Sequence, residues 1–383
     1  MAVYLDHAAT TPLRPEALAA MLPFLTEHFG NPSGSHAVAR RAKEAIEDAR
    51  EEVAAALGCL PREVVFTGGG TEADNLAIAG ALRAAGAGSR AVCSAIEHHA
   101  VLHPVESRGG SLIEVDREGV VDLEHLRSLL RPTGPSAAAG DVAVVSVMLA
   151  NNEIGVVQPL DDVVEVVREE ATGALVHTDA VHAFPWLDVA ELAAACDLVS
   201  VSAHKFGGPK GVGALVVREG TRIEALVEGG GQERELRSGT HNVAAIVGMA
   251  AAATATVAAR AVEVERVRVL RDRLVDAVLA NVDGVVEVSP RRCRVAGNAH
   301  LLVAGVESES VLALLDDAGV CASAGSSCAS GAMEPSHVLA AAGVAPELAA
   351  GAIRFSLGVT TTDDDVDIAV KQLVDTVARL RSS

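Results

Sequence analysis

Short runs of apolar, mostly β-branched residues recur through the first part of the chain. Helix-compatible stretches such as Pro159–Glu170 separate most of them. Apolar runs of this length are typical of buried strands. Because strands that alternate with helices build a mainly parallel sheet, the pattern predicts an α/β fold with a sheet sandwiched by helices. The predicted strands are Val64–Thr67, Val92–Ser94, Val142–Leu149, Leu175–Thr178, Leu198–Ser202 and Val212–Val217.

The pattern changes near Ala261, where a long charged helix (EVERVRVLRDRLVDAV) precedes short strands and helices. This change predicts a smaller α+β domain. We expect a large domain at residues 14–257 and a small domain made of residues 1–13 and 258–383. Residues 243–259 are uncharged but alanine-rich, and they fall short of the roughly 18 strongly apolar residues of a membrane span. They are predicted to form a buried helix, and the Pro- and Gly-rich residues 131–140 a linker.

Composition excludes several classes of protein. Half of the 383 residues are apolar and the mean hydropathy is +0.31, which predicts a folded rather than a disordered chain. The formal net charge is −20 and only 2% of the residues are aromatic, so we expect neither a nucleic-acid nor an anionic-membrane partner. Six scattered cysteines without a C-x-x-C pair, and a start without a secretory signal, predict a cytoplasmic protein.

Polar residues follow four of the predicted strands. They are residues 68–72 (GGGTE), 151–153 (NNE), Asp179 and 203–205 (AHK). In a parallel sheet, ligands bind beyond the carboxyl ends of the strands, so we expect one cleft to receive all four groups. The glycine run before a helix is suited to an anion such as phosphate, although GGG also occurs in plain turns.

Lys205 is one of only four lysines, against 27 arginines, and follows a strand among small residues. A lysine in such a place is suited to Schiff-base chemistry, although an ordinary surface lysine is the alternative. Asp179 ends another apolar run, where a carboxylate can hold the protonated pyridine nitrogen of pyridoxal 5′-phosphate. Together with the glycine loop, the two residues predict a site for this cofactor.

With these residues in place, the chain resembles the cysteine desulfurases, which belong to the class V aminotransferase group of fold type I pyridoxal-phosphate enzymes. The resemblance covers nearly the whole chain. It implies a homodimer that converts L-cysteine to L-alanine and leaves the sulfur as a persulfide on a cysteine. The motifs are YLDHAATTP (4–12), GNPSGSH (30–36), TGGGTEADNLA (67–77), EHHAV (97–101), NNEIGVVQP (151–159), HTDA (177–180), SAHKFGGPKGVGAL (202–215), GGGQERELRSGT (229–240), SAGSSCASGAMEPSHVL (323–339) and IRFSLG (353–358).

The resemblance also implies a role for each matching residue. Lys205 would attach the cofactor and then remove the Cα proton of the substrate, and Cys328 would accept the sulfur. His98 would stack on the cofactor ring, and Asp179 would pair with its pyridine nitrogen. Asn152 would contact the cofactor O3′ and the substrate carboxylate, which Arg354 would also bind. The phosphate would be bound by Gly70, Thr71, Ser202 and His204, together with Thr240 of the partner subunit.

One position departs from the family pattern. His182 stands three residues after Asp179, where the family usually has a glutamine that donates to the cofactor O3′. A neutral imidazole can donate the same bond, but its usual pKa near 6.5 predicts a pH-sensitive contact. The alternative is that His182 points away from the cofactor and only packs near Phe184 and Trp186.

Several alternatives stay open. His99 and His103 are spaced i, i+4 beside Glu97 and His98, as in some zinc sites, but no H-E-x-x-H or C-x-x-C motif accompanies them, so we expect no metal. A selenocysteine lyase or a cysteine-sulfinate desulfinase is the nearest other enzyme. A catalytically weak sulfur-relay or scaffold-binding subunit is the other class of protein. The expected partner is a sulfur-acceptor protein, either an iron–sulfur scaffold or a thiolation relay.

Overall fold

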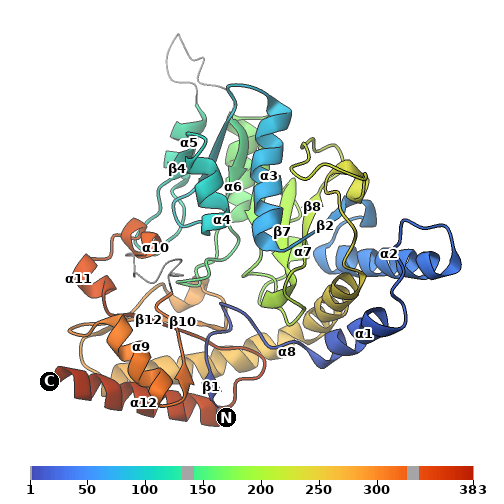
Figure 1. The fold of residues 1–383 in the computed structure, drawn as a ribbon. Coiled ribbons are helices and arrows are strands. Elements are labelled where there is room, and N and C mark those ends of the chain that lie inside the picture. Colours follow the sequence, from blue (N-terminus) through green and yellow to red (C-terminus); the bar gives the residue numbers. More distant parts are fainter. Residues whose placement is uncertain (1, 132–141, 326–335, 383) are drawn as a thin grey trace.

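The computed structural model describes residues 2–131, 142–325 and 336–382. The predicted linker at 131–140 lies almost entirely outside these residues, as does Cys328. In the described part of the chain, a seven-stranded sheet forms the upper half of Figure 1. β8 is antiparallel to both of its neighbours, whereas the other neighbouring pairs are parallel. In sheet order the strands are β2 (Val64–Thr67), β8 (Gly213–Val217), β7 (Leu198–Ser202), β6 (Leu175–Asp179), β5 (Val142–Ser146), β3 (Arg90–Ser94) and β4 (Ser111–Ile113).

Alternate residues of these strands point to opposite faces, as a doubly covered sheet requires. Val65 and Leu215 pack with Leu76 of α3, while Val64 and Val216 belong to the large core on the other face. Both faces are thus buried, which confirms the predicted fold class. The helices of this half are α2 (Ala37–Leu57), α3 (Gly70–Ala85), α4 (His99–Glu106), α5 (Leu123–Leu130), α6 (Leu160–Glu170) and α7 (Val189–Leu192), with the 3₁₀ turns η1 (Pro61–Glu63), η2 (Ala203–Lys205) and η3 (Glu233–Glu235).

A second sheet occupies the lower half of Figure 1. In the described residues it has three antiparallel strands, and a parallel pair joins the N-terminal segment to the same half. The antiparallel strands, in order, are β12 (Ala352–Ser356), β10 (Asn298–Val303) and β9 (Val285–Glu287), and the parallel pair is β1 (Val3–Tyr4) with β11 (Val320–Cys321). The helices are α9 (Ser308–Asp317), α10 (His337–Ala341), α11 (Pro346–Ala349) and α12 (Asp363–Arg381), with the turn η4 (Arg291–Cys293).

The helix α8 (Val243–Asn281) begins below the seven-stranded sheet and runs on into the lower half of the molecule (Figure 1). It packs against α1 (Pro15–Thr26) and α2 near its start and against α12 further along. Among the described helices, α8 is long and apolar enough to cross a membrane, but 56% of its most apolar window is buried inside the protein. The helix is continuous across the expected domain boundary at 257/258, and that division stays a prediction.

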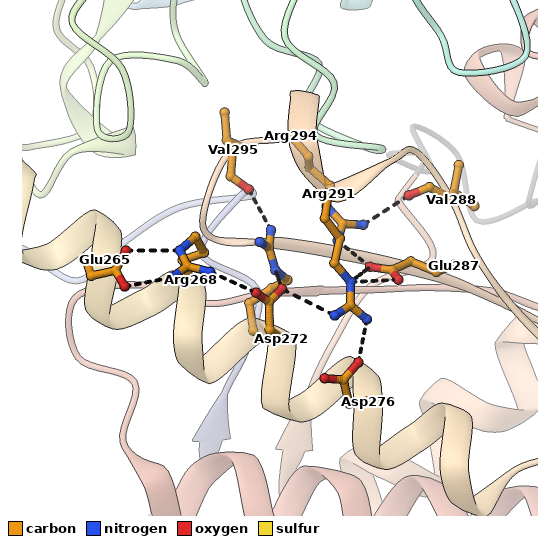
Figure 2. Close-up of polar contacts among 10 residues, drawn as sticks. Glu265, Arg268, Asp272, Asp276, Glu287, Val288, Arg291, Arg294 and Val295 are labelled. Carbon is orange, nitrogen blue, oxygen red and sulfur yellow. Dashed lines mark hydrogen bonds and ion pairs between the residues drawn. The ribbon is translucent and has the colours of Figure 1, made fainter.

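A network of ion pairs joins α8 to the segment after β9 (Figure 2). The side chain of Arg271 is 1% exposed; it donates to the carbonyl of Val295 at 3.1 Å and to the carboxylate of Asp272 at 2.7 Å. Arg291 bridges Asp276 of α8 at 2.7 Å and Glu287 of β9 at 3.0 Å. Because a buried guanidinium is costly unless its donors are satisfied, these contacts fix the backbone near Val295.

That backbone in turn holds a loop of the large sheet. The amide of Val295 donates to the carbonyl of Gly155 at 3.0 Å, and the amide of Val157 donates to the carbonyl of Cys293 at 2.8 Å. Gly155 has a positive φ of 76°, and a Cβ there would lie 2.7 Å from Cγ of Arg294, so only glycine fits. The loop that carries Asn152 is therefore fastened to the second half of the chain.

Candidate active site

A cavity of about 310 Å³ lies beyond the carboxyl ends of β5, β6 and β7. It brings together almost all the residues that the sequence singles out. Thr240 is exposed and is not part of the cavity wall, and Cys328 lies outside the described residues. The predicted residues in the wall are Gly70, Thr71, His98, Asn152, Asp179, His182, Ser202, His204, Lys205 and Arg354.

The start of α3 forms one end of the cavity. Gly69 precedes it with a φ of 148°, and a Cβ on Gly70 would lie 2.9 Å from Cγ2 of Val181. Small residues at both positions let a ligand approach the helix N-terminus, where free N–H groups and the helix dipole favour an anion. The hydroxyls of Thr71 and Ser202 lie at the same end.

Lys205 ends the short turn η2 that follows β7. Its Nζ donates to the carbonyl of Ala9 at 3.0 Å and also to that of Ala8. Burial, and secondly the positive charge of Arg354, lower the pKa of Lys205 to about 8. A lowered pKa increases the fraction of neutral amine, which is the nucleophilic form.

Asp179 is the last residue of β6 and is 4% exposed. One carboxylate oxygen accepts from the amide of Val181 at 2.8 Å. Burial raises the pKa of Asp179 to about 6, against the opposing effects of that bond and of Lys205. A cation placed beside this carboxylate would favour its charged form.

A second carboxyl group, Asp74, lies in the same wall and was not foreseen from the sequence. Burial raises its pKa, and Asp179 raises it further. His177 Nε2 is 3.6 Å from Asp74 Oδ1, but burial lowers the pKa of His177 to about 3, so the imidazole is neutral. Asp74 follows Thr71 by three residues on α3. Residues at this spacing share a helix face, so the sequence could have predicted that Asp74 lies at the cavity with Thr71.

Two histidines flank the cavity. His98 caps α4, where its Nδ1 accepts from the amide of Ala100 at 3.1 Å; burial lowers its pKa to about 4. Burial also lowers the pKa of His182 to about 3, and the positive charges of Lys205 and Arg354 contribute smaller decreases. Nε2 of His182 is buried and has no hydrogen-bond partner among the described residues. Any titration of His182 is thereby moved to acid pH, below the usual range of a histidine.

Arg354 comes from β12, on the other sheet. Its Nη1 donates to the carbonyls of Asn152 at 3.0 Å and Gly325 at 3.3 Å, and its Nη2 donates to Asp6 at 2.9 Å. The guanidinium therefore stands where three separate segments meet at the cavity. A planar fork of this kind can bind a carboxylate through two hydrogen bonds.

No group of three or more histidine, cysteine or acidic side chains within the described residues has the arrangement of a metal site. The rings of His99 and His103 instead stack with centroids 4.7 Å apart, and His99 also packs against His337 at 4.8 Å.

Residues 3–368 match the aminotransferase class-V family, and the chain belongs to it. It is 44% identical to a cysteine desulfurase IscS of Dictyoglomus turgidum, over 99% of this chain and 95% of that protein. It is 43% identical to an IscS-like cysteine desulfurase of Mycobacterium tuberculosis, over 99% and 97%. Within the family, the chain is therefore one of the cysteine desulfurases.

Solved structures agree with this assignment. A NifS-like protein superposes with a TM-score of 0.90 at 34% identity, covering 99% of this chain and all of that one. A NifS-like protein from Rickettsia africae superposes with a TM-score of 0.88 at 30% identity, with 99% and 100% covered. The predicted family, reaction class and cofactor, pyridoxal 5′-phosphate, are confirmed.

The residues present fit this cofactor. The start of α3 with Thr71 and Ser202 is an anion site, the buried carboxyl of Asp179 suits a protonated ring nitrogen, and Lys205 supplies the amine. The unpartnered Nε2 of His182 is a further polar atom at this wall. A buried nitrogen of this kind costs free energy until a ligand satisfies it.

Proposed function

We propose that this chain removes sulfur from L-cysteine, releases L-alanine and transfers the sulfur to Cys328. The observation that carries the proposal is a single cavity in which the amine of Lys205, the carboxyl of Asp179, the start of α3 and the guanidinium of Arg354 all meet. The bound cofactor supplies an electron sink for the substrate Cα.

We assign the roles within this cavity as follows. Arg354 binds the α-carboxylate of the substrate together with Asn152, and Lys205 removes the Cα proton. Asp179 and His98 hold the cofactor ring, His182 donates to its O3′, and its phosphate is bound by Gly70, Thr71, Ser202 and His204.

The transfer step needs no external oxidant. The thiolate of Cys328 attacks the substrate sulfur, and an S–S bond forms while the Cβ–S bond breaks. The electron pair stays on Cβ, which gains a proton and becomes the methyl group of alanine, and Lys205 returns a proton to Cα. Carbon is reduced and sulfur is oxidised in the same step, so atoms and electrons balance.

We also propose a homodimer in which Thr240 contacts the phosphate bound by the other subunit. Two features support it. Thr240 is exposed and lies outside its own chain's cavity wall. Leu18, Leu22 and Leu25, spaced along one face of α1, are between 52% and 60% exposed, and an apolar stripe of this kind is typical of a protein interface.

The proposed acceptor of the sulfur is a second protein, either an iron–sulfur scaffold or a thiolation relay, in the cytoplasm. Five cysteines lie in the described part of the chain and all five are free, which is usual in a reducing compartment.

The test compares substrates. The purified protein is incubated with L-cysteine, L-selenocysteine or L-cysteine sulfinate, with and without reductant, and alanine, sulfide and persulfide are measured. We expect turnover of L-cysteine with persulfide on Cys328, and Cys328→Ala should still change its absorption spectrum with L-cysteine but form no persulfide. Preference for selenocysteine or sulfinate, or turnover that does not need Cys328, would favour the other enzymes. No turnover of any substrate would favour a sulfur-relay subunit.

A further inference from the structure

Glu153 is a buried carboxylate next to Asn152, in the loop after β5. It is 4% exposed. Its Oε2 accepts from the hydroxyl of Ser336 at 2.6 Å. Its backbone carbonyl accepts from Nδ2 of Asn298 at 3.1 Å and from Nδ1 of His300 at 3.0 Å. Glu153 is therefore fastened to strand β10 and to the start of α10 by separate bonds.

Both described ends of the segment that carries Cys328 lie against Glu153. Ser336 caps α10 at one end and accepts from the amide of Leu339 at 3.1 Å. At the other end is Gly325, with a φ of 96°. A Cβ on Gly325 would lie 3.0 Å from Cε1 of His300 and 3.4 Å from Oε2 of Glu153. One carboxylate oxygen is thus close to residues that stand eleven positions apart in sequence.

The same place is joined to the substrate site. Nη1 of Arg354 donates to the carbonyl of Gly325 and to the carbonyl of Asn152. The amide of Glu153 donates to Oδ1 of Asn151 at 2.8 Å, so the loop around Asn152 is itself fixed. The bonds of Glu153 to this loop and to β10 use its backbone, so loss of its carboxyl group would release the Ser336 end of the segment and leave the loop that lines the cavity in place.

We propose that Glu153 is a positioning residue: it bonds the Ser336 end of the Cys328 segment close to the Gly325 end, which Arg354 bonds, and thereby sets the rate of sulfur transfer to Cys328. The proposal rests on the proposed function for its catalytic consequence. It assigns Glu153 no contact with substrate or cofactor. Since the hydrogen bond from Ser336 is made to a buried carboxyl oxygen, its loss is costly.

The experiment separates cofactor and substrate binding from sulfur transfer. Holoenzyme variants Ser336→Ala, Glu153→Gln and Glu153→Ala are mixed with one equivalent of L-cysteine. The absorption change reports substrate binding, and mass spectrometry of the trapped protein reports persulfide on Cys328. Ser128→Ala, an exposed serine of α5, is the matched control.

We expect Ser336→Ala and Glu153→Ala to slow persulfide formation about tenfold, the loss expected when a buried hydrogen bond is removed and its partner is left unsatisfied, while the absorption change keeps its rate. Glu153→Gln should recover part of the rate, because its amide oxygen can still accept from Ser336. Wild-type persulfide rates in both alanine variants would overturn the proposal. So would an equal slowing of the absorption change and the persulfide, which would mean general damage to the site. If Glu153→Ala does not fold, Ser336→Ala decides alone.

Hydrogen exchange keeps this proposal separable from the proposed function. In Glu153→Gln and Ser336→Ala, the amides of residues 323–325 and 337–339 should exchange faster than in the wild type, and those of β7 should not. Unchanged exchange at both ends would refute the anchoring. A wild-type protein that forms no persulfide would refute the proposed function and leave the exchange result to decide the anchoring.

Discussion

Asp6 and Arg354 form an ion pair at the cavity, with 2.9 Å between Oδ1 and Nη2. The side chain of Arg354 is 4% exposed and that of Asp6 is 23% exposed. Asp6 of the N-terminal segment therefore neutralises part of the positive charge of Arg354, and it orients the guanidinium. We assign this guanidinium to binding of the substrate carboxylate.

Arg354→Lys should raise the KM for L-cysteine about 10- to 100-fold with a smaller effect on kcat. A lysine ammonium cannot reach Asn152, Gly325 and Asp6 at once, and a hydrogen bond to a charged group contributes about 1.5–3 kcal/mol. Steady-state kinetics with L-cysteine measures both constants. An unchanged KM would remove Arg354 from the substrate site.

Borohydride treatment of the holoenzyme should fix the cofactor on the peptide that contains Lys205. The buried amine has a pKa lowered to about 8, whereas Lys210 is exposed. Peptide mass spectrometry locates the label. Lys205→Ala should lose the label and all turnover, and Lys210→Ala should keep both. A label on Lys210 would show that the wrong lysine was chosen.

Thr240→Ala should weaken cofactor retention although Thr240 lies outside its own cavity wall. Thr172→Ala, another exposed threonine of the same chain, should not. Dialysis followed by absorbance measures the retained cofactor, and light scattering on a sizing column measures the oligomer. A fully active monomer would contradict both the dimer and the role of Thr240.

His182→Gln should retain cofactor and activity, and its pH profile of kcat/KM should follow that of the wild type from about pH 6 upward. The imidazole is neutral there because burial lowers its pKa to about 3, and glutamine is neutral at every pH. The profiles should separate only in acid, where the wild type alone gains a proton. An inflection between about pH 6 and 8 that disappears in the variant would show that His182 titrates in that range.

The sheet was largely predictable because its strands are short apolar runs that end at polar or glycine residues. β2 and β7 match the predicted bounds, and β5 ends three residues early, at Ser146. β4 was missed because it has only three residues at the sheet edge. The sequence predicted two separate helices where the structure has the single helix α8. Neither proline nor glycine occurs between Met249 and Asn281, so nothing in the sequence ends the helix there. The change from apolar to charged residues near Ala261 reflects different surroundings along one helix.

The cavity wall was predictable where it depends on chain order. Asp179 and Lys205 follow parallel strands directly, and such residues gather at one edge of a sheet. Arg354 came only from the family resemblance, since nothing in its own sequence shows which loop β12 will meet. Glu153 was expected in the cleft with Asn151 and Asn152, but it lies outside the cavity wall, because it bonds Ser336 and His300, which only the tertiary fold brings to it.

The 39 residues of α8 form a continuous rod of about 58 Å, at about 1.5 Å per residue. A fragment that stopped at residue 257 would cut this helix after the first 15 of its 39 residues. It would also leave the buried side chains of the second half, among them Val267, Leu270 and Leu274, on a separate piece. The two halves of the molecule therefore share one structural member, and expressing them as separate proteins should give fragments that aggregate unless they are produced together.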